Sequence, residues 1–434
     1  MRPRTVEALV LGLAAAVGAA AFASAWIAAH GEASLGWVPW AALLAALFGV
    51  AHVAVRRFAP LADPMLFPLA ALLCALGLTF VHRIDPEAGR RQFVWVAVGL
   101  AVFVLVLAVL RRDVRGLERF KYLFGLSAVV LLALPSMPGV GERINGVKLW
   151  IQIGPLHIQP GEVAKLFLVI FLAAYLREKR ESLASGRLKD LGPLLVVWGA
   201  AMLVLVQTSD LGSALLTFGI FLAMLYVATG RALFVAVGFA LFLAGAAVLH
   251  AAIGRVQQRV TVWLEPWTED KVACALNGQF ELRQNCDSYQ LVKSLYSIAN
   301  GGYGGTGIGR GTFETVQGTP LIPYLETDFI YSAIAQELGL VGAAAVLLVY
   351  LALVGRGFRV ALAAQDGFSK LLAAGLAFGL ALQTFIIVGG TLRLVPLTGI
   401  TLPFMSYGGS SVVANFALLA LLLLVSHRAA AARR

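Results

Sequence analysis

Charged residues are scarce in this sequence. Asp, Glu, Lys and Arg make up 13% of its 434 residues, while 60% are hydrophobic. Soluble domains average about 25% charged and about 45–50% apolar residues. Because so few polar side chains cannot cover a water-facing surface, the composition excludes a disordered chain and a cytosolic enzyme. It predicts an integral membrane protein.

Cysteine and histidine are scarce as well, and this limits the chemistry available. With three cysteines, Cys74, Cys274 and Cys286, the chain is not a disulfide-rich secreted scaffold. The six histidines lie far apart, without metal-ligand spacing. The Gly-rich stretch 301–311 follows no parallel strand, so it is not a dinucleotide-binding motif. We expect no nucleotide cofactor.

Long apolar runs dominate what the chain does contain. A helix of about 20 apolar residues crosses the roughly 30 Å hydrocarbon core of a bilayer. We therefore predict an all-α polytopic membrane bundle of about 12 transmembrane helices. The first run could be a signal peptide, but its length and the span that follows it favour a retained helix. The predicted spans are 6–29, 36–55, 64–81, 92–110, 122–135, 160–176, 191–208, 212–229, 232–252, 328–354, 371–390 and 409–426.

The positions of the cations predict the orientation. The net charge is +11, but Lys and Arg occur in short clusters between apolar runs, which indicates topology signals and not a nucleic-acid surface. More of them fall on the side that holds both termini, so we place the termini in the cytoplasm and segment 253–327 outside. Within that segment, 255–267 and 289–299 have amphipathic helical patterns and either lie on the bilayer or pack against the bundle. Cys274 and Cys286 are either bridged or free thiols there.

Several ionisable residues lie in or beside the predicted spans. Because placing a charge at membrane depth costs free energy, each of them is expected to have a structural or functional role. Glu162 and Lys165 are three residues apart on one helix, and either form a structural ion pair or serve a site. Asp210 is suited to a helix cap or hinge. Asp328 lies at the start of a long apolar helix and follows the flexible Gly-rich stretch 301–311. There it is either a helix cap or a general base. Glu337 follows on that same helix.

Three cations fall in short outer loops, where the positive-inside rule disfavours them: Arg143, Lys148 and Arg393. Arg and Lys are suited to binding phosphate oxygens. Together with an outer carboxylate they suggest a phosphorylated lipid substrate, although exposed loop cations without a ligand would look the same.

Five segments, in order, resemble signatures of the SEDS (shape, elongation, division and sporulation) family. They are RINGVKLWIQIGPLHIQPGEVAKL (143–166), SDLGSALL (209–216), SYQLVKSLYSIANGGYGGTGIGRGT (288–312), ETDFIYSAIAQELGLVG (326–342) and PLTGITLPFMSYGGSS (396–411). The last segment is closer to the elongation branch than to the division branch. The family core has ten spans, so residues 1–60 look like an added transmembrane hairpin and 61–434 like the core.

The resemblance implies an inverting peptidoglycan glycosyltransferase that polymerises lipid II at the outer face of the cytoplasmic membrane, during cell elongation or division. It implies a class B penicillin-binding protein as partner and a divalent cation, Mg or Mn, on the pyrophosphate. A lipid flippase and a non-catalytic scaffold of the cell-wall machinery are the alternatives.

The resemblance also assigns roles to residues. Asp328 matches the acidic residue of the family's TDF motif and is the candidate catalytic base. Glu326 stands where the family often has His, and its charge would raise the pKa of Asp328. Asp210, Cys274 and Cys286 are expected to be structural. The candidate substrate-binding residues are Arg143, Lys148, Trp150, Glu162, Lys165, Glu326, Arg393, Ser406 and Ser410.

Overall fold

A computed structural model describes residues 3–30, 35–144, 147–154, 156–185, 188–268, 271–273, 280–315 and 319–433. The described chain is mainly α-helical, as predicted. Its first half contains α1 (Pro3–His30), α2 (Val38–Phe58), α3 (Leu66–Ile84), α4 (Pro86–Leu110), α5 (Lys121–Ala133), β1 (Gly141–Ile144), β2 (Val147–Ile153), β3 (Leu156–Ile158), α6 (Pro160–Ala184) and α7 (Gly192–Gln207). Its second half contains α8 (Leu211–Thr229), α9 (Ala232–Ala252), α10 (Gly254–Leu264), β4 (Lys271–Ala273), β5 (Phe280–Leu282), α11 (Tyr289–Gly301), α12 (Ile330–Ala363), α13 (Gly367–Thr391) and α14 (Gly409–Ala431).

Nine of the described helices are long and apolar enough to cross a membrane. The other three predicted spans correspond to α5, α6 and α7. Of these, α5 has 13 residues and α7 has 16, which is shorter than a bilayer crossing needs. The 25-residue α6 is less apolar because it carries charged residues near both of its ends. A membrane bundle is thus confirmed, while the number of twelve spans stays a prediction.

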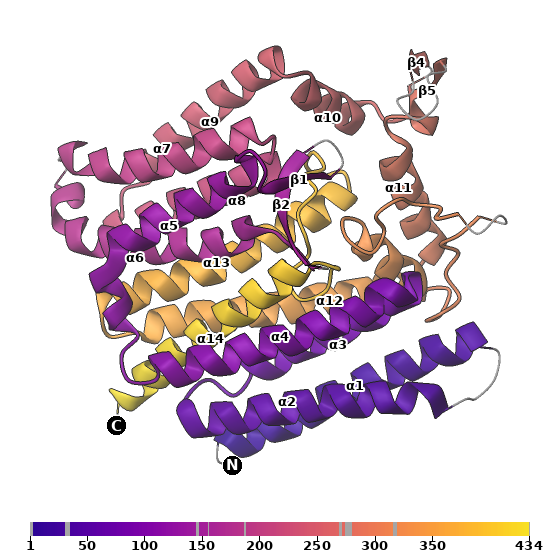
Figure 1. Ribbon diagram of the computed structural model, residues 1–434, viewed down its shortest axis with the longest axis horizontal. Helices are drawn as coiled ribbons and strands as arrows, with labels where there is room; N and C mark the ends of the chain where they lie inside the picture. Colours follow the sequence, from indigo (N-terminus) through magenta and orange to yellow (C-terminus); the bar gives the residue numbers. More distant parts are fainter. Residues whose placement is uncertain are drawn as a thin grey trace.

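The long helices run side by side, and both chain ends lie at one end of the bundle (Figure 1). The strands, α10 and α11 lie toward the opposite end. Near the centre, α14 packs against α4 and α12 packs against α13. α13 and α14 are the most buried of the spanning helices and α9 is the least. The core is therefore built around the two helices that flank segment 396–411.

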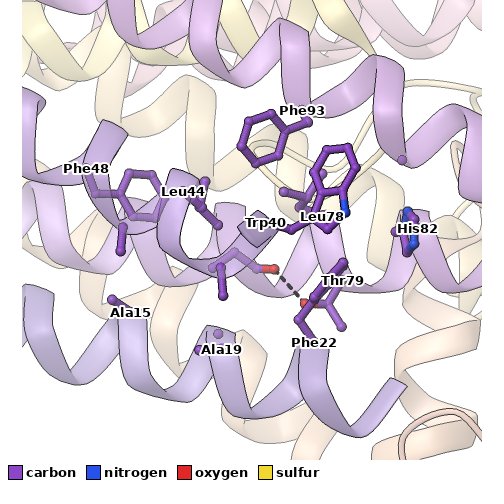
Figure 2. Close-up of a pocket in the computed structure, with 15 residues that line it drawn as sticks. Ala15, Ala19, Phe22, Trp40, Leu44, Phe48, Leu78, Thr79, His82 and Phe93 are labelled. Atoms are coloured by element: carbon purple, nitrogen blue, oxygen red, sulfur yellow. Dashed lines mark hydrogen bonds between the residues drawn. The ribbon is translucent and has the colours of Figure 1, made fainter. Parts of the chain in front are cut away.

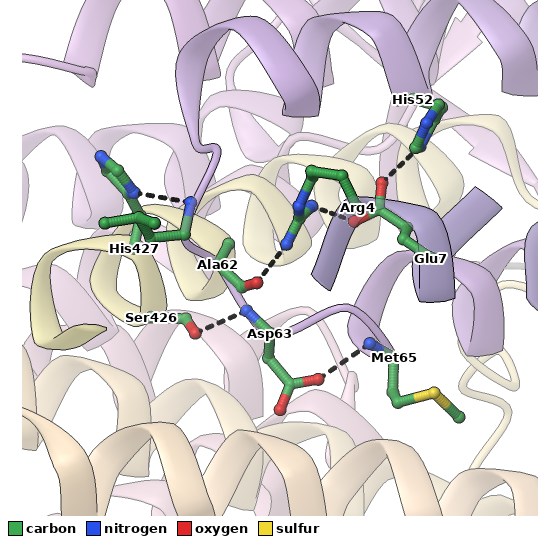
Figure 3. A network of polar contacts seen from close by, with 9 residues as sticks. Arg4, Glu7, His52, Ala62, Asp63, Met65, Ser426 and His427 are labelled. Atoms are coloured by element: carbon green, nitrogen blue, oxygen red, sulfur yellow. Dashed lines mark hydrogen bonds and ion pairs between the residues drawn. The ribbon is translucent and has the colours of Figure 1, made fainter. Parts of the chain in front are cut away.

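The N-terminal hairpin α1–α2 is fastened to the rest of the bundle at the end that carries the termini (Figure 3). The Glu7 carboxylate is fully buried and accepts hydrogen bonds from Arg4 and from His52, the latter at 2.7 Å. Arg4 also donates to the carbonyl of Ala62, which precedes α3. One buried acid thus joins α1, α2 and the start of the core.

The sequence did not predict the strands between α5 and α6. β1, β2 and β3 form an antiparallel sheet in which Arg143 pairs with Lys148 and Glu142 with Trp150. The register shifts between Glu142 and Arg143. This short sheet presents the predicted outer cations.

Helices occur in both amphipathic stretches of segment 253–327. α10 covers most of 255–267, and α11 covers 289–299. α11 packs against α12, where Ser294 and Ser332 share a 2.6 Å hydrogen bond and Ser297 donates to Gln336 at 2.6 Å. Of the two alternatives, the buried face of α11 therefore favours packing against the bundle.

Candidate active site

Asp328 lies in a turn immediately before α12. Its backbone N–H donates to the Tyr324 carbonyl at 3.0 Å, and the next residue, Phe329, is fully buried. Phe329, not Asp328, occupies the cap position of α12, and no side chain caps this helix. Among the described residues, the Asp328 carboxylate therefore does not serve as a helix cap.

Segment 396–411 holds this turn from the other side. The Ser406 hydroxyl donates to the Thr327 carbonyl at 2.5 Å and accepts from the Leu402 N–H at 2.9 Å. The Tyr407 N–H donates to the Glu326 carbonyl at 2.8 Å. Ser406, predicted to bind substrate, is almost completely buried and links the backbone of the Asp328 turn to segment 396–411.

Gly399 brings the same segment against the carboxylate. A Cβ at this position would lie 3.6 Å from Asp328 Oδ2, and the residue has a positive φ of 74°. Such a backbone conformation favours glycine. The backbone of 398–400 thus forms one wall beside Asp328.

Arg259 of α10 forms part of this site, and the sequence analysis missed it. Its guanidinium donates to the Thr398 carbonyl at 3.1 Å. Burial lowers the pKa of Arg259, and the nearby carboxylates of Asp328 and Asp210 oppose that change. An arginine in an amphipathic helix cannot be told from a solvent-facing cation by sequence pattern alone.

Burial raises the pKa of Asp328 to about 6. The Arg259 guanidinium opposes the rise, the Glu326 carboxylate adds to it, and a hydrogen bond with Thr327 opposes it. Burial also raises the pKa of Glu326. The like-charge effect predicted for Glu326 is present, but desolvation is the larger cause.

Asp210 caps α8, and its charge also acts on Arg259. Its Oδ1 accepts from the Ser213 N–H at 3.0 Å, and burial raises its pKa. The first turn of α8 packs closely on the loop beside Asp328, because a Cβ at Gly212 would lie 2.9 Å from the Thr398 carbonyl oxygen. Asp210 therefore has a structural partner and also contributes charge to the site.

Glu162 and Lys165 form an ion pair at 2.9 Å on the first turns of α6. Lys165 also donates to Gln383 Oε1 at 2.8 Å, and the Gln383 amide donates to the Thr401 carbonyl at 2.8 Å. The Gln159 N–H, just before α6, donates to Ser410 at 2.8 Å. All these contacts lead to segment 396–411, so the α6 pair is linked to the Asp328 turn.

The cations of the short sheet are more accessible than these residues. Arg143 is exposed, and Lys148 and Trp150 are half-buried. In the described part of the chain, no ion pair involves Arg143 or Lys148. β3 leads directly into α6 and lies against α14, which begins at the end of segment 396–411. The sheet is thus joined to the Asp328 turn through one intervening segment.

Arg393 is engaged elsewhere. Its guanidinium donates to the carbonyls of Trp263 at 2.7 Å and Leu264 at 2.6 Å, and lies 5.1 Å from the centre of the Trp267 ring. The Trp263 indole donates back to the Arg393 carbonyl at 3.1 Å. Arg393 therefore holds the end of α10, the helix that carries Arg259; its predicted role in substrate binding stays a prediction.

Two of the three cysteines lie in the described part of the chain. Cys286 is disulfide-bonded, Cys74 is a buried free thiol, and Cys274 lies outside the described residues. Among the residues that the structure describes, no group of three His, Cys, Asp or Glu side chains could hold a metal ion.

The buried Asp328 carboxylate does not cap a helix and lies at one end of a membrane bundle. This arrangement matches the family of membrane proteins that the sequence motifs resemble. The chain belongs to the FtsW/RodA/SpoVE family of cell cycle proteins, whose family model matches residues 64–431. It is 41% identical to the peptidoglycan glycosyltransferase RodA of Mycobacterium leprae, over 98% of this chain and 91% of that protein.

Two solved structures are also similar. One is from a peptidoglycan synthase complex studied for its coordination of polymerization and crosslinking; it has a TM-score of 0.68, 30% identity, and coverage of 85% of this chain and 98% of that one. The other is the Thermus thermophilus rod shape determining protein RodA, with a TM-score of 0.60, 28% identity, and coverage of 85% and 97%.

Proposed function

We propose that this chain is a peptidoglycan glycosyltransferase that polymerises lipid II into glycan strands. The observation that carries the proposal is Asp328: a desolvated carboxylate, free of any capping role, whose pKa of about 6 suits a general base near neutral pH. Family membership and the names of the relatives support the same reaction.

In the proposed reaction, the Asp328 carboxylate accepts the proton of the acceptor sugar hydroxyl. The hydroxyl oxygen forms a bond to the anomeric carbon of the growing donor chain from the face opposite its leaving group. The bond from that carbon to the pyrophosphate oxygen breaks, and undecaprenyl pyrophosphate leaves with the electron pair. Attack from the opposite face inverts the configuration at the anomeric carbon.

Three cations are suited to the negative charge of the substrate. Arg143 and Lys148 lie on the accessible sheet and bind the pyrophosphate, while Trp150 shapes the adjoining surface. Arg259 is closer to the base, because its charge acts on Asp328 directly. Arg259 therefore keeps the carboxylate ionised over part of the pH range in which burial alone would protonate it.

A divalent cation is implied by the family, but the described residues do not fit a protein-held metal site. They supply no group of three suitable ligands, and the charges beside Asp328 include a cation. An ion that accompanies the pyrophosphate as part of the substrate remains compatible with this arrangement.

The membrane placement and partner belong to the same proposal. Both termini lie at the bundle end opposite the strands and α10, which supports cytoplasmic termini and an extracytoplasmic site, in line with the cation distribution (Figure 1). A class B penicillin-binding protein would cross-link the strands that this chain polymerises. We also propose residues 1–60 as a hairpin added to a core of 61–434, since the family model begins at residue 64.

A lipid flippase is the second candidate, favoured by the number of membrane helices. A glycosyltransferase needs Asp328 for turnover, whereas a flippase would need it at most for transport. The test is polymerisation of lipid II by purified wild type and Asp328→Asn, each with and without the partner. We expect the variant to lose about 10²–10⁴-fold in rate.

Asp63→Asn is the matched control, because Asp63 lies at the opposite end and pairs with Arg356 at 3.2 Å. Equal polymerisation by Asp328→Asn and wild type would overturn the catalytic assignment. Absence of polymerisation by wild type with its partner would favour the flippase.

A further inference from the structure

The helix that follows Asp328 is interrupted. Inside α12, Gly339 has a φ of 67° and a ψ of −172°, a backbone conformation that only glycine adopts easily. The interruption separates half-helix 330–338, which directly follows the Asp328 turn, from the longer remainder of α12. The orientation of half-helix 330–338 is therefore not set by the rest of α12.

The glycine-rich loop 301–311 fills this interruption with its own backbone. An unbroken helix would join the N–H groups of residues 340 and 341 to the carbonyls of residues 336 and 337. The same four groups instead bond to the loop: Leu340 N–H to the Gly302 carbonyl at 2.9 Å, Val341 N–H to Tyr303 at 3.2 Å, Thr306 N–H to the Gln336 carbonyl at 3.0 Å, and Gly307 N–H to Glu337 at 2.9 Å. The loop thus bonds to both sides of the interruption and joins them.

Two oppositely charged side chains hold the loop in this position. The Glu337 carboxylate is fully buried and accepts from the N–H groups of Gly309 at 2.9 Å and Gly311 at 3.0 Å. The Arg83 guanidinium donates to the carbonyls of the same two glycines, at 3.0 and 3.1 Å, and lies 3.6 Å from the Glu337 carboxylate. Arg83 and Glu337 therefore fix the same short stretch of loop from two helices, α3 and α12.

The N-terminal hairpin supports the end of α3 that carries Arg83. The ring centre of His82, the preceding residue, lies 5.2 Å from that of Phe22 in α1 and 6.4 Å from that of Trp40 in α2 (Figure 2). A Cβ at Gly309 would lie 2.4 Å from a side chain of α1, so the loop also touches the hairpin directly. The loop is thus held between the hairpin and α12.

We infer that Arg83 and Glu337 are positioning residues for the catalytic base. By holding loop 301–311 in the interruption of α12, they fix the orientation of half-helix 330–338 and, through it, the place of the Asp328 carboxylate. This inference rests on the proposed glycosyltransferase function and adds two residues that do not touch the substrate.

The lever is long enough for a small change to matter. Half-helix 330–338 is about 13 Å long, so a tilt of about 5° at Gly339 would move its Asp328 end by about 1 Å. A misplacement of about 1 Å can lower the rate of an enzyme about 10²-fold. Substrate held by the sheet would still bind, so the loss should appear in kcat and not in KM.

The test is steady-state polymerisation of lipid II by the purified full chain with its penicillin-binding protein, expressed per folded molecule. Arg83→Gln cannot hold both loop carbonyls and should lower kcat at least tenfold, while the KM for lipid II changes less than twofold. Arg310→Gln is the control, because Arg310 is an exposed arginine of the same loop, and it should keep the wild-type kcat.

A second pair of variants tests the loop without removing a charge, and decides the matter if Arg83→Gln does not fold. Gly307 has a φ of 96°, and a Cβ there would meet only the Arg310 side chain, at 3.5 Å. Gly307→Ala therefore strains the inserted backbone without a clash, and should lower kcat about threefold. Gly304→Ala is the control, because a Cβ at Gly304 would meet open space, and it should leave kcat unchanged.

Combining Arg83→Gln with Asp328→Asn separates positioning from a general loss of structure. Without the base there is no carboxylate to position, so Arg83→Gln should not lower the residual rate of Asp328→Asn any further. A further tenfold loss in the double variant would indicate a merely structural role and overturn the inference. If Asp328→Asn loses its rate while Arg83→Gln and Gly307→Ala keep the wild-type kcat, the positioning role alone is wrong. If Asp328→Asn polymerises as fast as wild type, the proposed function fails and the inference fails with it.

Discussion

At the bundle end that carries the termini, buried charge is matched by opposite charge in direct contact. Glu7 is shared between Arg4 and His52, and Asp63 pairs with Arg356. At the opposite end, Asp328 and Glu326 are desolvated, and no ion pair within the described residues involves them or the accessible cations Arg143 and Lys148. A paired buried charge stabilises a fold, whereas a desolvated charge without an ion-pair partner is available for a ligand.

The comparison predicts that removing a charge at the end with the termini changes stability more than activity. Glu7→Gln leaves the Arg4 charge without its buried counterion, and breaking such a pair typically costs about 3–5 kcal/mol. We expect a clear fall in the free energy of unfolding in detergent, and near-normal polymerisation by the protein that remains folded.

Glu178→Gln is the control for this change. Glu178 pairs with Lys121 at the same end but is 42% exposed, so its loss should change stability by less than about 1 kcal/mol. If Glu7→Gln and Glu178→Gln were equally stable, the α1–α2 network would not be the fastening that its geometry indicates.

At the other end, Lys148→Met should change substrate affinity and leave the fold intact. Lys148 is half-buried on β2 and has no ion-pair partner among the described residues, so its replacement breaks no ion pair there. Loss of one charged contact to the pyrophosphate should raise the KM for lipid II about tenfold. Steady-state polymerisation kinetics measure this, with Lys293→Met on α11 as the control cation at the same end; an unchanged KM would contradict the assignment.

Arg259→Gln tests whether the missed arginine acts on the base through its charge. The positive charge lowers the pKa of Asp328, so its removal should raise that pKa above about 6. A general base must be ionised, so the acid limb of the kcat/KM profile should move to higher pH. A one-unit rise would lower activity at pH 5 about tenfold, with much less effect at pH 8.

Glu326→Gln should shift the pKa of Asp328 in the opposite direction. It removes a negative charge that raises the pKa of Asp328, so its acid limb should move to lower pH. A uniform loss of activity at every pH in Arg259→Gln would instead indicate that the arginine only holds the backbone at Thr398.

The sequence identified the parts of this molecule that are repetitive or chemically conspicuous. Apolar runs predicted the helices, and Asp328 stood out because a carboxylate at the start of an apolar helix is costly. The short sheet at 141–158 was not predicted, because a few residues of strand among glycines and prolines carry no clear period. The charge on α6 gave a correct i, i+3 pair, but nothing in the local pattern could reveal its contact with Gln383, 218 residues away.

Arg259 and Arg393 show most clearly what the sequence alone could not predict. The sequence treated Arg393 as a cation for substrate and left Arg259 on a surface helix. In the structure Arg393 contacts the end of α10, and Arg259 is the one whose charge acts on Asp328. Whether an arginine of α10 acts on Asp328 depends on how α10 packs on segment 392–400, and that tertiary contact has no local signature in the sequence.

The pH dependence of stability should also differ in sign between the two ends. The pKa of Asp328 is about 6 in the folded chain, against about 3.9 when unfolded, so the folded state binds more protons between these values. Its contribution to stability is therefore present below about pH 4 and is lost as the pH rises through 6.

Asp328→Asn removes that loss, so its unfolding midpoint should exceed that of wild type at pH 7.5 and match it near pH 4. Asp63→Asn gives up the contact with Arg356 and should show no gain at either pH. A lower midpoint for Asp328→Asn at pH 7.5 would mean that the ionised carboxylate stabilises the fold, and the contrast between paired and available charge would fail at its central residue.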